Sequence, residues 1–229
     1  METQIKNKKL LHIHIPKTGG WTIQSLLEEL DFPPQPYGHT FARNIKNILN
    51  DNFDDYFKFA HTRNPWDRLV SVYSFCKNGS EVLPTHTTGG LRTPPEHVWF
   101  DKLKCTSFDD FVSKVNFISQ GRGDVYMTPT FSTMPNNLNE SNINYLTLNQ
   151  YNWVYDDKDK LMVDFIGKME NFEDIIKNVN LSTGLNLPVP PKRNTSYHVP
   201  YTQFYNDKTK KIVSKLYEKD IDTFKYTFE

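Results

Sequence analysis

The sequence predicts an α/β domain in which a central parallel sheet is flanked by helices. Apolar runs that suit buried strands lie near residues 10–15, 56–62 and 162–168, and segments with helical spacing follow them. Strands that alternate with helices in this way form parallel sheets. The chain has 229 residues, enough for one compact core, and it contains no internal repeat or dividing linker. We therefore expect a single domain over 1–229.

The expected helices follow from capping residues and hydrophobic spacing. Pro65 suits the first turn of a helix, because the N–H that proline lacks has no partner there. Ser107 can cap a later helix whose first turn carries two acidic residues. The four helices expected in this part of the chain span about 21–30, 41–50, 65–76 and 107–118.

Two stretches read as irregular insertions. Residues 77–104 contain a Gly-Gly pair, a Thr-Pro-Pro run and scattered histidines, and residues 120–142 are rich in loop-forming residues. A Pro-rich loop also spans 31–40. We expect the two insertions, 77–104 and 120–142, to shape a substrate pocket.

The stretch LLHIHIPKTGGWT predicts a strand, a tight turn and the start of a helix. Such a turn gathers backbone N–H groups and the positive end of a helix dipole at one place, here beside Lys17 and the hydroxyl of Thr18. A phosphate-like dianion binds well there. The order of residues is neither that of a Walker loop nor G-x-G-x-x-G. The alternative is an ordinary turn, in which Gly19 and Gly20 serve only the backbone geometry.

A second motif, RNPWDRLVSVY, follows the second predicted strand. Arg63 stands at the strand end and Ser71 lies in the helix that follows. A guanidinium group and a hydroxyl group can together hold a phosphate. We expect Arg68, in contrast, to lie on a solvated face and to pair with Asp67 or Asp55.

The pair PKTGGWT and RNPWDRLVSVY resembles the two signature elements of the sulfotransferases that use 3′-phosphoadenosine-5′-phosphosulfate (PAPS). The similarity is closest to the branch of the Golgi carbohydrate O-sulfotransferases and their small bacterial and viral relatives. It implies a P-loop-like sulfotransferase fold, PAPS as donor and 3′-phosphoadenosine-5′-phosphate (PAP) as product, without a metal. The resemblance assigns to the 5′-phosphosulfate Lys17, Thr18, Gly19, Gly20, Trp21 and Thr22. It assigns to the 3′-phosphate Arg63 and Ser71.

Later segments extend the resemblance along the chain. Residues 163–175 resemble the late strand of the family, with its Glu-Asn turn and helix, and residues 192–228 resemble its closing Asn-x-Ser loop and final helix. One departure occurs at 126–135. The sequence there is YMTPTFSTMP, where many relatives carry His-x-x-Pro-Gln.

For the chemistry we expect two catalytic residues. Lys17 would neutralise the charge that develops on the leaving oxygen. His39 resembles the base of the heparan sulfate 2-O- and 6-O-sulfotransferases, and an imidazole titrates near neutral pH, as a general base should. Alternatively, His39 only caps a helix or faces solvent. We expect His12 and His14 to pack or form hydrogen bonds beside the sheet, because no cluster of histidines and cysteines has the spacing of metal ligands.

The remaining histidines can be assigned only general roles. His61, on a buried strand, should be structural. His86 and His97 could touch the acceptor, and His198 could lie near the donor.

Composition limits the partners. The 27 basic and 27 acidic residues balance, so nucleic acid and membrane surfaces are not expected partners. Two cysteines do not make a disulfide framework in a chain of this size, which favours a reducing compartment and a cytoplasmic location. The expected partners are a small-molecule donor and a hydroxyl acceptor, on a glycan or a small alcohol. The sequence indicates no particular oligomeric state.

Two other functions compete with this one. A nucleotide kinase or NTPase would need Mg²⁺, a Walker-type loop and an aspartate at a strand end, and the first loop has the wrong order of residues. A non-catalytic module that binds PAPS or PAP would keep the donor site and lack the base.

Overall fold

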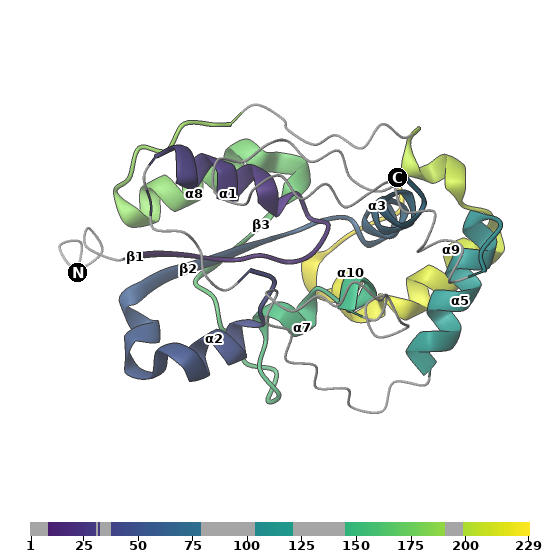
Figure 1. Cartoon of the computed structure of the whole chain (residues 1–229), viewed down its shortest axis with the longest axis horizontal. Helices are drawn as coiled ribbons and strands as arrows, with labels where there is room; N and C mark the ends of the chain where they lie inside the picture. The colour runs from purple at the N-terminus through teal and green to yellow at the C-terminus, as the bar shows by residue number, and fades with distance from the viewer. Residues whose placement is uncertain (1–8, 31, 33–37, 79–103, 121–144, 191–198) are drawn as a thin grey trace. The chain divides into compact units, whose positions relative to one another are not determined.

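The computed structural model describes residues 9–30, 32, 38–78, 104–120, 145–190 and 199–229. Within them, one parallel sheet has the strand order β1-β2-β3, with β2 in the middle (Figure 1). Its strands are β1 (Lys9–Ile13), β2 (Tyr56–Thr62) and β3 (Phe165–Lys168). The prediction of an α/β fold with a parallel sheet flanked by helices is confirmed.

The register of the strands places two carboxyl ends beside one another. β1 pairs with β2 from Lys9↔Tyr56 to Ile13↔Ala60, so β2 continues two residues beyond the last pair. Both strands run in the same direction. The loop after β1 and the residue after β2 therefore emerge at the same edge of the sheet, where ligands bind in open α/β sheets.

The described chain divides into two compact units. The first unit contains the described residues up to Arg63 together with 149–190, and it includes the whole sheet. The second contains 64–78, 104–120, 145–148 and 199–229. The single domain expected over 1–229 stays a prediction.

In the first unit, helices cover both faces of the sheet. Figure 1 shows α1 (Gly20–Glu29) and α8 (Phe172–Thr183) on one side of the strands. It shows α2 (Ala42–Leu49) and α7 (Tyr151–Val154) on the other side. Two short 3-10 helices complete the unit: η2 (Asn50–Asp55) and η4 (Met169–Asn171).

The core between the sheet, α1 and α8 follows from strand alternation. Leu10 of β1 and Phe57 and Phe59 of β2 face the buried side chains of both helices. Full burial of side chains of this size contributes about 1.5–3 kcal/mol each. By the same alternation, the positions that follow on this face are His12 and His61, so histidines replace apolar residues toward the carboxyl ends of the strands.

The second unit is helical in its described part. Its elements are α3 (Pro65–Asn78), α5 (Phe108–Gln120), η5 (Tyr201–Phe204), α9 (Asp207–Leu216) and α10 (Glu218–Phe224). The two predicted helix starts are confirmed. α3 begins at Pro65, and the Ser107 hydroxyl accepts the Asp110 N–H at 3.2 Å ahead of α5. The final helix expected within 192–228 is interrupted at Tyr217.

Some boundaries differ from those expected. β1 ends at Ile13, earlier than predicted, because the chain turns sharply after it, and the one-turn helix α7 was not expected. Most of both expected insertions, 79–103 and 121–144, and the departure at 126–135 lie outside the described residues. The same holds for His86, His97 and His198.

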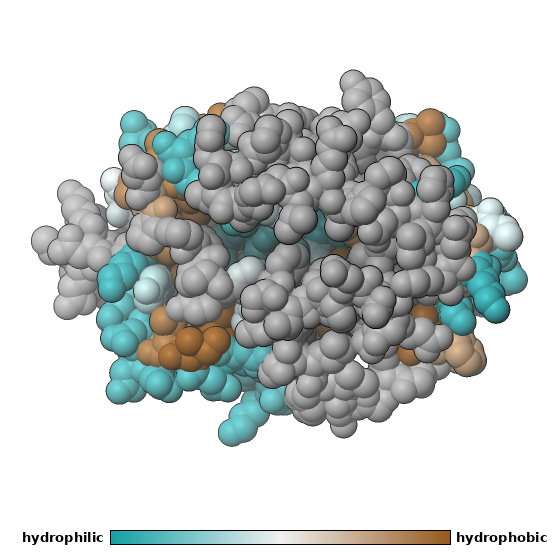
Figure 2. All heavy atoms as spheres, viewed as in Figure 1, coloured by the Kyte–Doolittle hydropathy of each residue, from teal (hydrophilic) through white to brown (hydrophobic). Residues whose placement is uncertain are grey.

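The described surface is mixed. On the face that Figure 2 shows, hydrophilic residues predominate among those coloured, and the hydrophobic areas are separate. Large apolar side chains with high exposure, such as Phe117 and Leu181, lie on different helices. None of the described helices has both the length and the apolar character needed to cross a bilayer.

Candidate functional site

The loop that connects β1 to α1, residues 14–19, has an unusual backbone. Lys17 has φ 64° and Gly19 has φ 87°, both in the left-handed region. For a lysine this conformation costs on the order of 1–3 kcal/mol, and such strain concentrates at functional sites. Gly19 precedes the first residue of α1, and no side chain caps that end of the helix. The loop can thus present backbone N–H groups and a helix N-terminus to an anion.

Some side chains of this loop and of the first turn of α1 are buried, and others reach the surface. The Thr18 hydroxyl donates to the Ile15 carbonyl at 2.9 Å, and Thr18 is fully buried. Its hydroxyl proton therefore holds the turn, and its backbone N–H is what Thr18 can offer an anion. Lys17 is half-buried, whereas Trp21 is 40% exposed. The Thr22 N–H bonds to the Gly19 carbonyl at 3.0 Å, which closes the first turn of α1.

Arg63 brings a cationic side chain into contact with this loop. It follows the last residue of β2, is 8% exposed, and donates from Nη1 to the Lys17 carbonyl at 3.3 Å. Within the first unit, the Arg63 side chain therefore contacts the backbone of the β1–α1 loop, and the roles of Lys17 and Arg63 in binding anions stay predictions. A guanidinium group carries five N–H donors, so it can serve the loop and an anion together.

Two residues of the second motif lie in the second unit. Ser71 is buried on α3, and its part in a phosphate site stays a prediction. Arg68 is only 1% exposed and donates to the Leu146 and Leu148 carbonyls, both at 2.8 Å. The prediction that Arg68 lies on a solvated face is wrong. Its guanidinium group is buried and binds the backbone carbonyls of Leu146 and Leu148.

Four histidines, His12, His14, His39 and His61, form a continuous group of rings that we call the histidine array. His12 and His61 stack with centroids 5.1 Å apart, and His12 Nε2 lies 3.2 Å from His61 Nδ1. The His12 and His14 rings lie 5.6 Å apart, and those of His14 and His39 lie 4.1 Å apart. His12 thus forms a hydrogen bond with His61, and His14 packs against other rings beside the sheet, in line with the expectation for these two residues.

Burial disfavours a positive charge on three members of the array, His12, His14 and His61. It lowers the pKa of His12 and of His14 well below the usual value, and it lowers the pKa of His61 to about 4. A proton on one ring also disfavours a proton on its neighbours, which lowers the pKa of His12 and His14 further. His39 is half-buried. Within the described ranges, no group of three or more His, Cys, Asp or Glu side chains is arranged to hold a metal.

His14 joins the array to the loop. A Cβ atom on Gly20 would lie 2.0 Å from Cδ2 of His14, so the imidazole packs directly on the backbone at the start of α1. The edge of His14 also meets Trp21, with centroids 6.5 Å apart. Gly20 therefore serves close packing of a ring, in addition to the turn.

The position of His39 depends on α2 and α7. Phe41, at the start of α2, packs against Trp153 of α7 at 4.6 Å, and Trp153 lies edge-on to His39 at 6.5 Å. Trp153 is fully buried. No pattern in the sequence singles out Trp153, because α7 is only one turn long.

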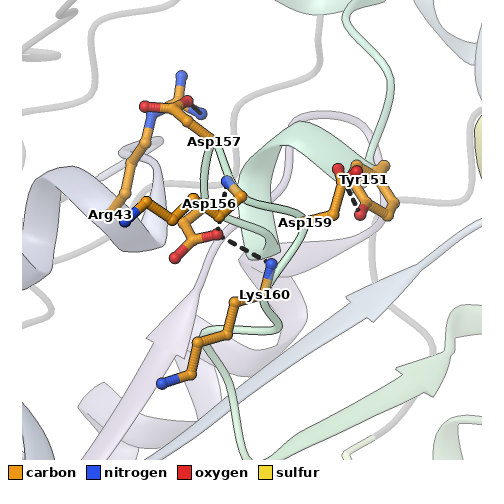
Figure 3. A network of polar contacts seen from close by, with 7 residues as sticks. Arg43, Tyr151, Asp156, Asp157, Asp159 and Lys160 are labelled. Carbon is orange, nitrogen blue, oxygen red and sulfur yellow. Dashed lines mark hydrogen bonds and ion pairs between the residues drawn. The ribbon is translucent and has the colours of Figure 1, made fainter.

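Polar contacts tie α2 to the turn that follows α7 (Figure 3). Arg43 of α2 forms an ion pair with Asp157 at 3.3 Å. Asp156 accepts the N–H of Lys160 at 2.8 Å, and the Tyr151 hydroxyl donates to Asp159 at 2.9 Å. These contacts fix the turn on which Arg43 is anchored and thereby support the helix that begins just after His39.

The model of the sulfotransferase family matches residues 3–227, nearly the whole chain. No curated protein matches the sequence.

Proposed function

Because the chain belongs to the sulfotransferase family and is therefore an enzyme of sulfuryl transfer, we propose that it uses PAPS as donor and a hydroxyl group as acceptor. The acceptor we propose is a carbohydrate or a small alcohol. The family assignment removes the support for a nucleotide kinase.

The observation that carries the proposal is the contact between the ends of β1 and β2. The Arg63 guanidinium donates to the backbone carbonyl of Lys17, so the side chain that follows β2 touches the loop that follows β1. A nucleotide with two separate anionic groups can use both. The β1–α1 loop would hold the 5′-phosphosulfate, through Lys17, through the hydroxyl of Thr22 and through backbone N–H groups. Arg63, with Ser71, would hold the 3′-phosphate.

The reaction needs little else from the protein. A bond forms between the acceptor oxygen and sulfur while the bond from sulfur to the 5′-phosphate oxygen breaks, and that oxygen keeps the electron pair. Lys17 would neutralise the charge on the leaving oxygen, which is greatest in the transition state. The acceptor proton passes to a base. The products are PAP and a sulfate ester.

We propose His39 as that base. It is half-buried, and its ring contacts His14, which itself packs on the loop. A base beside the loop is where an acceptor hydroxyl would need it. Burial lowers the pKa of its neighbours His12 and His14 well below the usual value, so these rings add no positive charge beside His39 near neutral pH.

We further propose a cytoplasmic location. The two cysteines, Cys76 and Cys105, are buried free thiols, which suits a reducing compartment.

A transfer assay tests the function. Protein, PAPS and a panel of sugars, phenols and small alcohols would be incubated, and both PAP and the sulfate ester would be quantified. We expect equal amounts of the two products with at least one acceptor, and no transfer with ATP as donor. Phosphoryl transfer from ATP, or failure to bind PAP, would contradict the proposal.

A further inference from the structure

A side-chain amide continues the pairing of β2 beyond the last residue of the strand. The Arg63 N–H donates to Gln150 Oε1 at 2.8 Å, and Gln150 Nε2 donates to the Arg63 carbonyl at 2.8 Å. Gln150 is fully buried just before α7. One amide group thus pairs with both backbone groups of a single residue, as a neighbouring strand would. We call this pair of hydrogen bonds the Gln150 clamp.

The clamp acts where the sheet has ended. The last pair of β2 with β3 is Thr62↔Lys168, and the last pair of β2 with β1 is Ile13↔Ala60. Arg63 is buried, so its backbone groups need partners within the protein. The Gln150 clamp supplies them and fixes the backbone from which the Arg63 side chain extends.

A fixed backbone matters most for a long side chain. Arginine has several rotatable bonds, and its planar guanidinium group binds a phosphate well only in the correct orientation. The Gln150 clamp holds the base of this side chain, and the contact of Nη1 with the Lys17 carbonyl holds its tip. The orientation of the guanidinium group is therefore set from both ends.

We infer that Gln150 is a positioning residue that gives the enzyme its selectivity for nucleotides with a 3′-phosphate. This inference rests on the proposed function, in which Arg63 binds that phosphate. Gln150 acts only through the Arg63 backbone. Without the clamp, the guanidinium group takes several orientations and the 3′-phosphate contact weakens, while the contacts of the β1–α1 loop with the 5′-phosphate remain.

The chain contains a matched control. Asn180 of α8 clamps Leu187 in the same manner: it accepts the Leu187 N–H at 2.8 Å and donates to the Leu187 carbonyl at 2.9 Å. This second clamp lies in the same unit and supports a buried leucine of the core. Asn180→Leu therefore removes an equivalent pair of hydrogen bonds that does not involve Arg63.

The experiment is calorimetric titration of PAP and 5′-AMP into four folded proteins: wild type, Gln150→Met, Asn180→Leu and Arg63→Ala. In Gln150→Met, we expect the ratio of PAP affinity to 5′-AMP affinity to fall about tenfold or more. The affinity for 5′-AMP should stay within about twofold of wild type. Asn180→Leu should melt at a lower temperature and keep the full preference. If Gln150→Met does not fold, Gln150→Asn replaces it, because this shorter amide cannot reach both backbone groups.

Each outcome has a distinct meaning. A folded Gln150 variant with the wild-type preference overturns the inference, provided that Arg63→Ala loses it. A wild type that binds PAP and 5′-AMP equally overturns instead the assignment of Arg63 to the 3′-phosphate. Equal loss of preference in Gln150→Met and Asn180→Leu overturns the inference as well, because general destabilisation then explains the effect.

Discussion

The β1–α1 loop and the histidine array are neighbours in the first unit, yet they respond to charge in opposite ways. The loop combines a left-handed Lys17 with the uncapped start of α1, so it attracts an anion. The array consists of stacked, mostly buried imidazoles, and burial lowers the pKa of His61 to about 4. The two regions meet where His14 lies on Gly20.

The proposed function assigns these two regions to different halves of a sulfuryl transfer. The leaving group becomes more negative and needs a fixed positive environment. The acceptor must lose a proton and needs a base that is uncharged before the reaction. Variants in the two regions should therefore fail in different ways.

The largest effect is expected at His39. His39→Ala should lower turnover by about 10²–10⁴-fold, the usual range for a general base. The affinity for PAP should change little, because the base faces the acceptor. His39→Phe is the matched control: it keeps a ring against His14 and Trp153 without a proton acceptor, so it should be as inactive as alanine. If either variant keeps near wild-type turnover on a competent acceptor, the base lies elsewhere.

Removal of the Lys17 side chain should affect the rate of transfer more than the binding of donor. Lys17→Ala should lower turnover by about 10²–10³-fold, and the affinity for donor should fall much less, because the charge on the leaving oxygen peaks in the transition state. Lys46→Ala, at an exposed position of α2, serves as the control and should be neutral. Steady-state kinetics with saturating acceptor measures both. A change confined to donor affinity would make Lys17 an anchor.

The array also predicts how stability depends on pH. Folding lowers the pKa of His12, His14 and His61, so the unfolded chain binds protons first as the pH falls. The free energy of unfolding should be highest above about pH 6.5 and decrease below it, by roughly 3 kcal/mol for His61 alone once the pH reaches its folded value. Nearby His39 and Lys17 also face this group, and both disfavour a proton on His14.

Urea unfolding at about pH 7 and about pH 5 measures this slope. His61→Phe keeps an aromatic ring beside His12 and should reduce the slope. Equal stability of the wild type at both pH values would contradict the account of a neutral array.

The loop could be predicted from the sequence, whereas the support around it could not. Pro16, Lys17 and the glycines are adjacent, so local turn chemistry identifies them. The alternation of His12 and His14 similarly indicates one face of a strand. His39 reaches His14 only because Phe41 packs on Trp153, and this contact joins segments that are far apart in the sequence.

Arg63 and Arg68 illustrate the same limit. Both residues follow β2. The sequence identifies them as cationic hydrogen-bond donors, but it does not show which groups surround them in the folded chain. Gln150, 87 positions from Arg63, pairs with its backbone, and nothing in the local sequence distinguishes this glutamine from a solvated one. Arg68 is buried because the Leu146 and Leu148 carbonyls need donors, which only the folded chain reveals.

We propose that the ends of β1 and β2 bind two different anionic groups of one nucleotide. Calorimetric titration of wild type and Arg63→Ala with PAP, 5′-AMP and ATP tests it most directly. The wild type should prefer PAP to 5′-AMP, and Arg63→Ala should lose most of this preference, about 1.5–3 kcal/mol for a charged hydrogen-bonded contact. Equal affinity of the wild type for PAP and 5′-AMP, or tighter binding of ATP than of PAP, would contradict the claim.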